Sequence, residues 1–84
     1  QLTIEDEAFS TLTNLHDLIL NNIQATEINP RWFRDLISLH ELQMNHNSIR
    51  NLPRNIFAHL TNFTRLDLSH NQLCETFKVL LMNM

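Results

Sequence analysis

The 84-residue sequence contains no glycine and no tyrosine, and only one cysteine, one tryptophan and two prolines. Phosphate-cradling loops need glycine where the backbone approaches the phosphate, so a glycine-rich nucleotide site is excluded. The single cysteine, Cys74, excludes a disulfide within the chain and leaves the redox compartment open. Cys74 is expected to be an incidental thiol or half of a bridge to another segment, because no base partner marks it as a nucleophile.

Positive charge is also scarce, with six Lys and Arg against nine Asp and Glu and a net charge of -3. The basic residues are scattered singly, so no basic face follows a nucleic-acid backbone and no nucleic-acid partner is expected. No apolar run approaches the roughly 20 residues that a membrane-spanning helix needs. The N-terminus lacks the basic and apolar regions of a signal peptide, so any targeting or membrane segment is expected outside this sequence.

Leucine and asparagine are abundant, and they recur with a period of 24 residues. Within residues 39–62, apolar residues occupy repeat positions 1, 4, 6, 11, 14, 19 and 22, and Asn47 occupies position 9. Residues 15–38 repeat positions 1, 4, 6, 14, 19 and 22, and the residues from Phe63 repeat positions 1, 4, 6, 9 and 11. A helical bundle would need a 3.6-residue spacing and gives this recurrence no role, so we reject it.

A period of 24 lies within the range of leucine-rich repeats, whose units bury their apolar face only by stacking on neighbours. We therefore expect one domain, residues 1–84, with a partial repeat (1–14), two full repeats (15–38 and 39–62) and a degenerate last repeat (63–84). Ile23 occupies position 9 of the first full repeat, so either the loop is locally shifted there or the series of asparagines is interrupted. The outer return segments are predicted to be irregular, with short 3₁₀ turns near residues 31–33 and 55–57.

Neither end of the chain has the polar end unit that usually closes a stack of repeats. After Leu73 the pattern weakens, since Thr76 takes an apolar position while Leu81 and Met84 still fall on positions 19 and 22. We therefore expect a fragment of a longer array, and we expect the isolated chain to self-associate or to be marginally folded.

The segment from Leu39 to Asn71, with Leu52-Pro53, Phe57 and Leu60-Thr61-Asn62, closely resembles the 24-residue repeats of extracellular leucine-rich-repeat proteins, above all Toll and Toll-like receptor ectodomains. The resemblance implies an α/β fold: a right-handed solenoid with short parallel strands on a concave face and an irregular or 3₁₀ convex side. It also implies a cell-surface or secreted location, a role in innate-immune or developmental signalling, and a protein ligand or second receptor chain as partner.

The same repeat class occurs in Slit, in small proteoglycans, and in neuronal adhesion and neurotrophin-receptor ectodomains, so another extracellular adhesion or matrix protein is an alternative. An intracellular leucine-rich-repeat scaffold shares the architecture and is a second alternative. An enzyme is not expected, because no set of nucleophile, base and orienting group can be named.

Repeat positions 1, 4 and 6 are expected to point inward, so positions 2, 3, 5, 7 and 8 should form columns on the concave face, spaced like strands at about 4.8 Å. The two best-formed repeats supply donors and acceptors of both signs, and we expect them to bind the ligand. The predicted set is His40, Glu41, Gln43, Asn45, His46, Arg65, Asp67 and His70. The alternative is a solvated face, with binding elsewhere in a longer protein.

Two position-9 residues, Asn47 and Asn71, are expected to form a structural series whose amides bond backbone groups that the turn after each strand leaves unpaired. His46 and His70 should be neighbours, which suggests a pH-sensitive contact or a metal site. Two imidazoles without a third ligand are too few, so we expect no metal and no cofactor. Glu41 and Arg65 are expected to form a cross-strand ion pair.

Two features lie outside the predicted face. Asn62-Phe63-Thr64 is an acceptor sequence for N-glycosylation and predicts a glycan on Asn62 if the protein is secreted. Trp32, beside Phe33, is expected to pack over the convex side, the alternative being an anchor for a partner.

Overall fold

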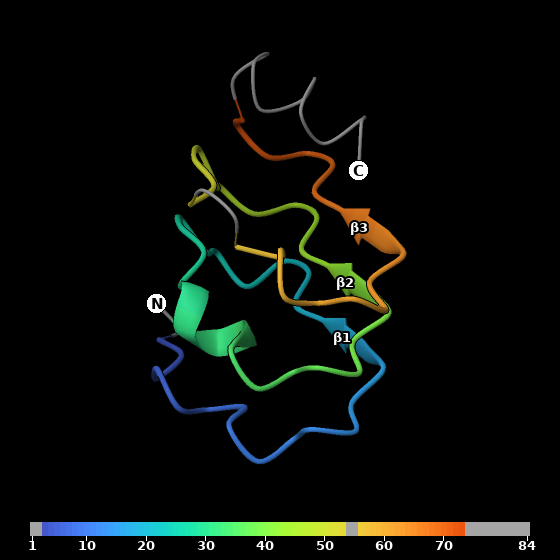
Figure 1. Ribbon diagram of the computed structural model, residues 1–84. Coiled ribbons are helices and arrows are strands. Elements are labelled where there is room, and N and C mark those ends of the chain that lie inside the picture. Colours follow the sequence, from blue (N-terminus) through green and yellow to red (C-terminus); the bar gives the residue numbers. More distant parts are fainter. Residues whose placement is uncertain (1–2, 54–55, 74–84) are drawn as a thin grey trace.

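The computed structural model describes residues 3–53 and 56–73. Three short strands, β1 (Asp17–Ile19), β2 (Glu41–Gln43) and β3 (Arg65–Asp67), lie side by side in one parallel sheet of order β1-β2-β3 (Figure 1). Leu18 pairs in register with Leu42, and Leu42 with Leu66, so partners are 24 residues apart. The predicted repeat length and the stacking of these leucines are confirmed. The predicted weakening after Leu73, and Cys74 itself, lie outside the described residues.

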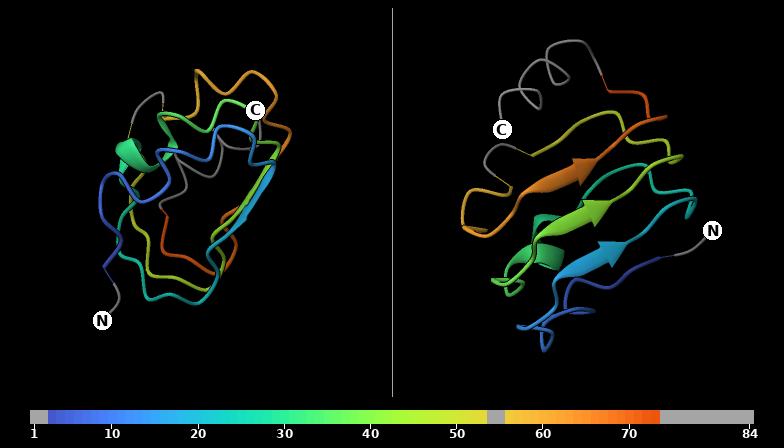
Figure 2. Two further views of the ribbon diagram at one scale, coloured as in Figure 1. Left: turned by 90° about the horizontal axis from the view of Figure 1, so that it is seen from below. Right: turned by 90° about the vertical axis from the view of Figure 1, so that its right-hand side faces the viewer.

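Each strand forms at the same place in its repeat, where a leucine stands between two residues that are both polar in β2 and β3, while β1 has Ile19 on one side. The central leucine points into the core while its neighbours point outward, which is the two-residue period of a half-buried strand. In β2, for example, Leu42 is fully buried between two partly exposed neighbours. Seen along the stack of strands, the successive turns of chain superimpose into a single loop (Figure 2). The predicted division into inward and outward positions is therefore correct for the strands.

The return side of the first full repeat contains a 3₁₀ helix, η1 (Pro30–Phe33), on the side of the molecule opposite the sheet (Figure 1). Asn29 begins the helix, because its side-chain oxygen accepts a hydrogen bond from the N–H of Arg31 at 3.0 Å. Pro30 then supplies a helical φ at a position where no N–H is needed. One of the two predicted 3₁₀ turns is thus confirmed, and η1 is the only helix in the described part of the chain.

The second predicted 3₁₀ turn, near residues 55–57, falls only partly within the described residues. Residues 56–59 form a turn, closed by a hydrogen bond from the N–H of Leu60 to the carbonyl of Phe57 at 3.0 Å. The cap and proline that begin η1 have no counterpart at the same repeat positions, where Pro53 takes the place of Asn29. Residues 54 and 55, which have the repeat positions of the first half of η1, lie outside the described residues.

The core fills the space between the sheet and the return segments. Its fully buried side chains come from the region where one repeat covers the next, so the middle of the stack is the best-packed part. They are Phe33, Leu36, Leu39, Leu42, Met44 and Ile49. Trp32 is also buried, its indole N–H donating to the carbonyl of Ile4 at 3.3 Å, so its packing role is confirmed and a role as an exposed anchor is excluded. No helix among the described residues is long and apolar enough to cross a membrane.

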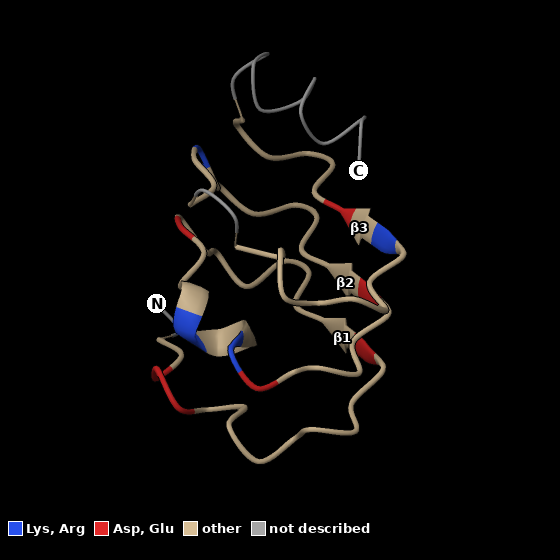
Figure 3. Cartoon of the chain, in the orientation of Figure 1, with Lys and Arg blue, Asp and Glu red and all other residues tan. Residues whose placement is uncertain are grey.

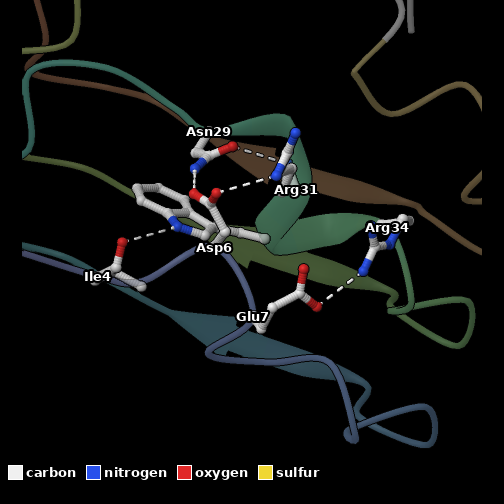
Figure 4. A network of polar contacts seen from close by, with 7 residues as sticks. Ile4, Asp6, Glu7, Asn29, Arg31 and Arg34 are labelled. Atoms are coloured by element: carbon white, nitrogen blue, oxygen red, sulfur yellow. Dashed lines mark hydrogen bonds and ion pairs between the residues drawn. The ribbon is translucent and has the colours of Figure 1, made fainter.

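A polar cluster that we did not predict joins the N-terminal segment to η1 (Figure 4). Arg31 contacts Asp6 at 3.2 Å, and Arg34 contacts Glu7 at 2.8 Å. The Asn29 amide also donates to Asp6, so the residue that caps η1 is itself held by the preceding segment. The ion pairs are exposed and contribute little stability. The ion pairs join the partial repeat (1–14) to the first full repeat (15–38).

Asn47 forms several of the hydrogen bonds that join the loops following the strands. Its side-chain oxygen accepts from the N–H groups of Ile23 and Ala25 at 3.0 and 3.1 Å. Its amide nitrogen donates to the carbonyls of Leu20 and Met44 at 3.1 and 3.0 Å. One buried side chain therefore satisfies backbone groups of two successive repeats.

Asn71 does the same one repeat later, accepting from the N–H of Ile49 at 3.0 Å and donating to the carbonyl of Met44 at 2.8 Å. The predicted role of the position-9 asparagines is confirmed at both residues. In the first full repeat Ile23 cannot take that role, and the neighbouring Gln24 has a φ of 61° that position 10 lacks in the other repeats. The loop is locally reshaped there and the series of asparagines is interrupted, so the two consequences of Ile23 that were predicted as alternatives occur together.

We predict that Asn47→Ala lowers the free energy of unfolding by about 2–4 kcal/mol, because several backbone groups lose their only side-chain partner while staying out of water. Equilibrium unfolding in urea, followed by fluorescence of the buried Trp32, measures this. Asn51 is exposed and serves as the matched control, with an expected loss of about 0.5 kcal/mol or less for Asn51→Ala. Equal losses in the two variants would show that the amide of Asn47 has no special role.

Candidate functional site

The outward side chains of the sheet form one continuous surface, which we call the strand surface. It consists of repeat positions 2, 3, 5, 7 and 8 in the three repeats that contain β1, β2 and β3. All eight residues predicted to bind a ligand lie on it, on β2, on β3 or within three residues of them. The charged residues of the three strands are on the side of the molecule opposite η1 (Figure 3).

The centre of the strand surface is a chain of side-chain contacts that crosses all three repeats. Arg65 contacts Glu41 at 3.8 Å, which confirms the predicted cross-strand pair. The Gln43 amide donates to Glu41, and Asn21 donates to the Gln43 carbonyl oxygen at 3.1 Å. Asn21 also accepts the backbone N–H of Asn45 at 2.8 Å. The amides are thus held in fixed orientations by their neighbours.

Asp67 is the most strongly held acidic group on this surface. Asn45 donates to one carboxylate oxygen at 2.9 Å, and the hydroxyl and N–H of Ser69 donate to the other at 2.7 and 3.0 Å. The hydrogen bond from Asn45, followed by those from Ser69, lowers the pKa of Asp67 to about 2, and Arg65 adds a small attraction. Asp67 is therefore a permanent anion at neutral pH with both oxygens already engaged.

His46 and His70 are neighbours, as predicted, with ring centroids 4.2 Å apart and planes only 19° from parallel. Rings stacked in this way direct their in-plane lone pairs alongside each other, so the two nitrogens do not converge on one ion. Among the described residues no group of three or more potential ligands could hold a metal. This arrangement presents two exposed aromatic edges at one border of the strand surface.

A second histidine pair lies at the opposite border. His16 and His40 have ring centroids 4.8 Å apart, and Nδ1 of His40 lies 2.9 Å from the carbonyl of Ser38. The hydroxyl of Thr64 donates to the carbonyl of His40 at 3.2 Å and continues the same column. His40 is half-buried, so it supports this border more than it projects from it.

The predicted set missed several residues that belong to the same network, among them Asn21, His16 and Ser69. Each shares a repeat position with a residue that was chosen, at position 7 for Asn21 and Ser69 and at position 2 for His16. A prediction that included every residue at a chosen repeat position would have contained these three residues. Asn21 and His16 were left out because the repeat that contains Ile23 fits the pattern less well.

Some side chains on the strand surface remain free to meet a partner. The side chain of Arg65 is 69% exposed and contacts Glu41 only at long range. Ile19, at position 5 of β1, is 59% exposed and offers an apolar contact beside the polar network. A protein partner can therefore find a cation, fixed acceptors, amides and one aliphatic group on a single face.

Asn62, the predicted glycan acceptor, is exposed in the turn that immediately precedes β3. Phe63, the middle residue of the acceptor sequence, is half-buried and stacks against Phe57, with ring centroids 5.0 Å apart. Thr64 is exposed. The turn thus holds the acceptor amide on the outside of the molecule, which is the placement that modification requires.

The comparison with protein families gives two overlapping matches to the family described as leucine rich repeat, over residues 2–49 and 13–73. The chain belongs to the leucine-rich-repeat family. The matched residues include all three strands and η1. A search of curated proteins gives no match. Leucine-rich-repeat domains generally mediate protein–protein interaction, and the polar, preorganised strand surface of this leucine-rich-repeat chain is consistent with that activity.

We predict that Asp67→Asn lowers stability at neutral pH and that the difference disappears in acid. Because folding lowers the pKa of Asp67 to about 2, its contribution is complete above the unfolded value near 4 and is lost as the pH falls through about 2. After allowance for solvent screening we expect no more than about 1 kcal/mol.

Urea unfolding of both proteins between about pH 2 and pH 7 measures this difference. Asp17→Asn is the matched control, because Asp17 occupies an exposed position on β1 and makes no ion pair with any described residue. A stability difference for Asp67→Asn that stays constant down to the lowest pH would contradict the proposed hydrogen bonds to the carboxylate.

Proposed function

We propose that this chain is a protein-binding part of a Toll-type receptor ectodomain and that its strand surface receives a protein ligand or a second receptor chain. The observation that carries the proposal is the fixed network across the strand surface, in which amides and carboxylates of three successive repeats hold one another in place. Side chains ordered before binding lose little entropy when a partner arrives. The proposed activity is recognition without catalysis.

The Toll-type and extracellular parts of the proposal are supported by sequence resemblance rather than by the geometry. The segment 39–71 has the residue pattern typical of extracellular repeats, and the exposed acceptor sequence at Asn62 suits a secreted protein. An intracellular scaffold needs neither feature. An extracellular and an intracellular location therefore differ in whether Asn62 carries a glycan, which can be measured directly.

Binding is tested with a panel of secreted proteins and receptor ectodomains applied to the immobilised chain. For any protein that binds, Gln43→Arg and Arg65→Ala are expected to weaken the affinity about tenfold or more, because they place a bulky cation at the centre of the strand surface or remove its exposed guanidinium. Arg34→Ala, on the opposite side, is the control and should change the affinity less than about twofold. A hit that is equally sensitive to Arg34→Ala would place binding on another face.

Expression through a secretory pathway is expected to add one N-linked glycan at Asn62. Mass spectrometry before and after enzymatic deglycosylation measures the added mass. Asn62→Gln and Thr64→Ala should each abolish the glycan, since the acceptor needs both residues, whereas Asn51→Gln should leave it in place. A secreted chain without any glycan on Asn62 would remove this support for an extracellular location.

A further inference from the structure

Four of the five histidines in the chain lie on the strand surface. His16 and His40 form a pair at repeat position 2, before β1 and β2, and His46 and His70 form a pair at position 8, beyond β2 and β3. The fifth, His59, is on the return side, where its Nε2 lies 2.8 Å from a backbone carbonyl. Histidine is the side chain that ordinarily changes its charge between about pH 5 and pH 8. Two borders of one face are therefore lined by groups that gain charge in mild acid.

The remaining charged residues of the strand surface are three carboxylates and one guanidinium, Asp17, Glu41, Asp67 and Arg65. While the histidines are neutral, these four residues give the surface a net charge of -2, and the whole chain has a net charge of -3. The hydrogen bonds that lower the pKa of Asp67 to about 2 keep its charge in mild acid, and a guanidinium stays charged throughout. Protonation of the histidines adds up to four positive charges, so the surface changes from anionic to cationic.

Both pairs can take up a proton without losing a hydrogen bond. The amide of Asn45 donates to Asp67, so its oxygen faces Nδ1 of His46 at 2.9 Å and that nitrogen carries the hydrogen. Nδ1 of His40 likewise lies 2.9 Å from the carbonyl of Ser38, which can only accept. In both rings the proton taken up in acid therefore goes to Nε2. The charge of the surface changes while these contacts are kept.

At position 8, His46 and His70 stack with ring centroids 4.2 Å apart. Asp67 is joined to His46 only through the amide of Asn45, and neither ring forms an ion pair with a described carboxylate. Along the loops that follow β1 and β2, the next charged residues are Glu27 and Arg50. Positive charge gained by this pair therefore makes this border of the strand surface cationic.

At position 2, the pair lies next to the acidic residues of the strands. Asp17 and Glu41 directly follow His16 and His40, and they are in register on β1 and β2. Arg65, on β3, contacts Glu41 from the other side at 3.8 Å. Positive charge gained by this pair therefore opposes the attraction of the two carboxylates for a cation.

We propose that the strand surface binds a basic segment of its protein partner at neutral pH and releases that segment in mild acid. This proposal rests on the proposed function and adds the charge of the partner and the control of its binding. A face with net negative charge attracts Lys and Arg side chains. Ile19, 59% exposed on the same face of β1 as Asp17, receives the aliphatic part of such a side chain while its charged end reaches the carboxylate. The N–H groups of Arg65 bind a carbonyl oxygen of the same segment.

The histidines act on the partner through their charge and need not touch it. Positions 2 and 8 are about 20 Å apart along an extended chain, so the centre of the surface lies about 10 Å from each border. That distance is about one Debye length at 0.1 M salt, so charges at the borders still act at the centre. All the charges gained in acid are positive, and together they lower the affinity for a basic segment. The loss of affinity is expected to become smaller as the salt concentration is raised.

Fluorescence anisotropy with a labelled probe peptide tests the proposal on the 84-residue chain. The probe is an extended peptide with lysine at alternate positions, and a second peptide with glutamate in place of lysine is the comparison. In about 0.05 M salt, we expect the lysine peptide to bind about tenfold more weakly at about pH 5.5 than at about pH 7.4. At neutral pH the glutamate peptide should bind more weakly than the lysine peptide. Circular dichroism at both pH values checks that the chain stays folded.

Residues that the repeats already use at the same positions replace the histidines. Position 8 is left-handed and is asparagine in the first full repeat, so His46→Asn and His70→Asn keep a residue that tolerates this backbone. Position 2 is threonine in the last repeat, so His16→Thr and His40→Thr are made there. With all four changes, the affinity for the lysine peptide should differ less than about twofold between the two pH values.

His59→Gln is the matched control, because His59 is on the return side and a glutamine amide can still donate to the carbonyl of Phe33. This variant should keep the pH dependence of the parent chain. Equal binding of the lysine peptide by the parent chain at both pH values would overturn the proposal. Tighter binding of the glutamate peptide at neutral pH, or a pH dependence that survives all four histidine changes, would overturn it as well.

Gln43→Arg separates a failure of this proposal from a failure of the proposed function. A protein from the binding panel that is blocked by Gln43→Arg but binds equally at both pH values would leave the strand surface as the binding site and exclude its control by pH. A lysine peptide whose pH-dependent binding is unchanged by Gln43→Arg would place that binding on another face and would contradict both proposals.

Discussion

The turn that follows each strand leaves backbone N–H and C=O groups without a partner in the sheet. Asn47 meets this need for two repeats at once, and Asn71 repeats the arrangement. Regular structure in the described residues is limited to one four-residue helix and three three-residue strands, so side-chain amides satisfy backbone groups that longer elements would pair. The 24-residue period is maintained because these amides hold each loop at a fixed distance from the loop of the preceding repeat.

The strand surface depends on the same constraint. Because the loops are fixed, successive strands keep one register, and side chains at equal repeat positions become neighbours. Hydrogen bonds then form along and between the columns, from Asn21 to Gln43 and from Asn45 to Asp67. A partner therefore meets groups that are already ordered, so less conformational entropy is lost on binding. Recognition by a surface of this kind follows from repetition and needs no deep cavity.

The sequence predicted the features that repeat and missed the ion pairs between neighbouring return segments. Leu18, Leu42 and Leu66 align from the order of residues alone, because burial at a fixed period leaves a visible pattern. The cluster of Asp6 and Glu7 with Arg31 and Arg34 does not, because exposed ion pairs depend on how two return segments lie and carry little energy.

Position 8 changes how the histidines of the strand surface should be interpreted. Asn22, His46 and His70 have φ values of 58°, 57° and 57°, so this position is left-handed in all three repeats. In a chain without glycine, asparagine and histidine are among the residues that tolerate this conformation best. A backbone requirement thus accounts for His46 and His70 without any ligand. The case for binding therefore rests more on Arg65, Glu41 and Gln43, whose types no backbone conformation requires.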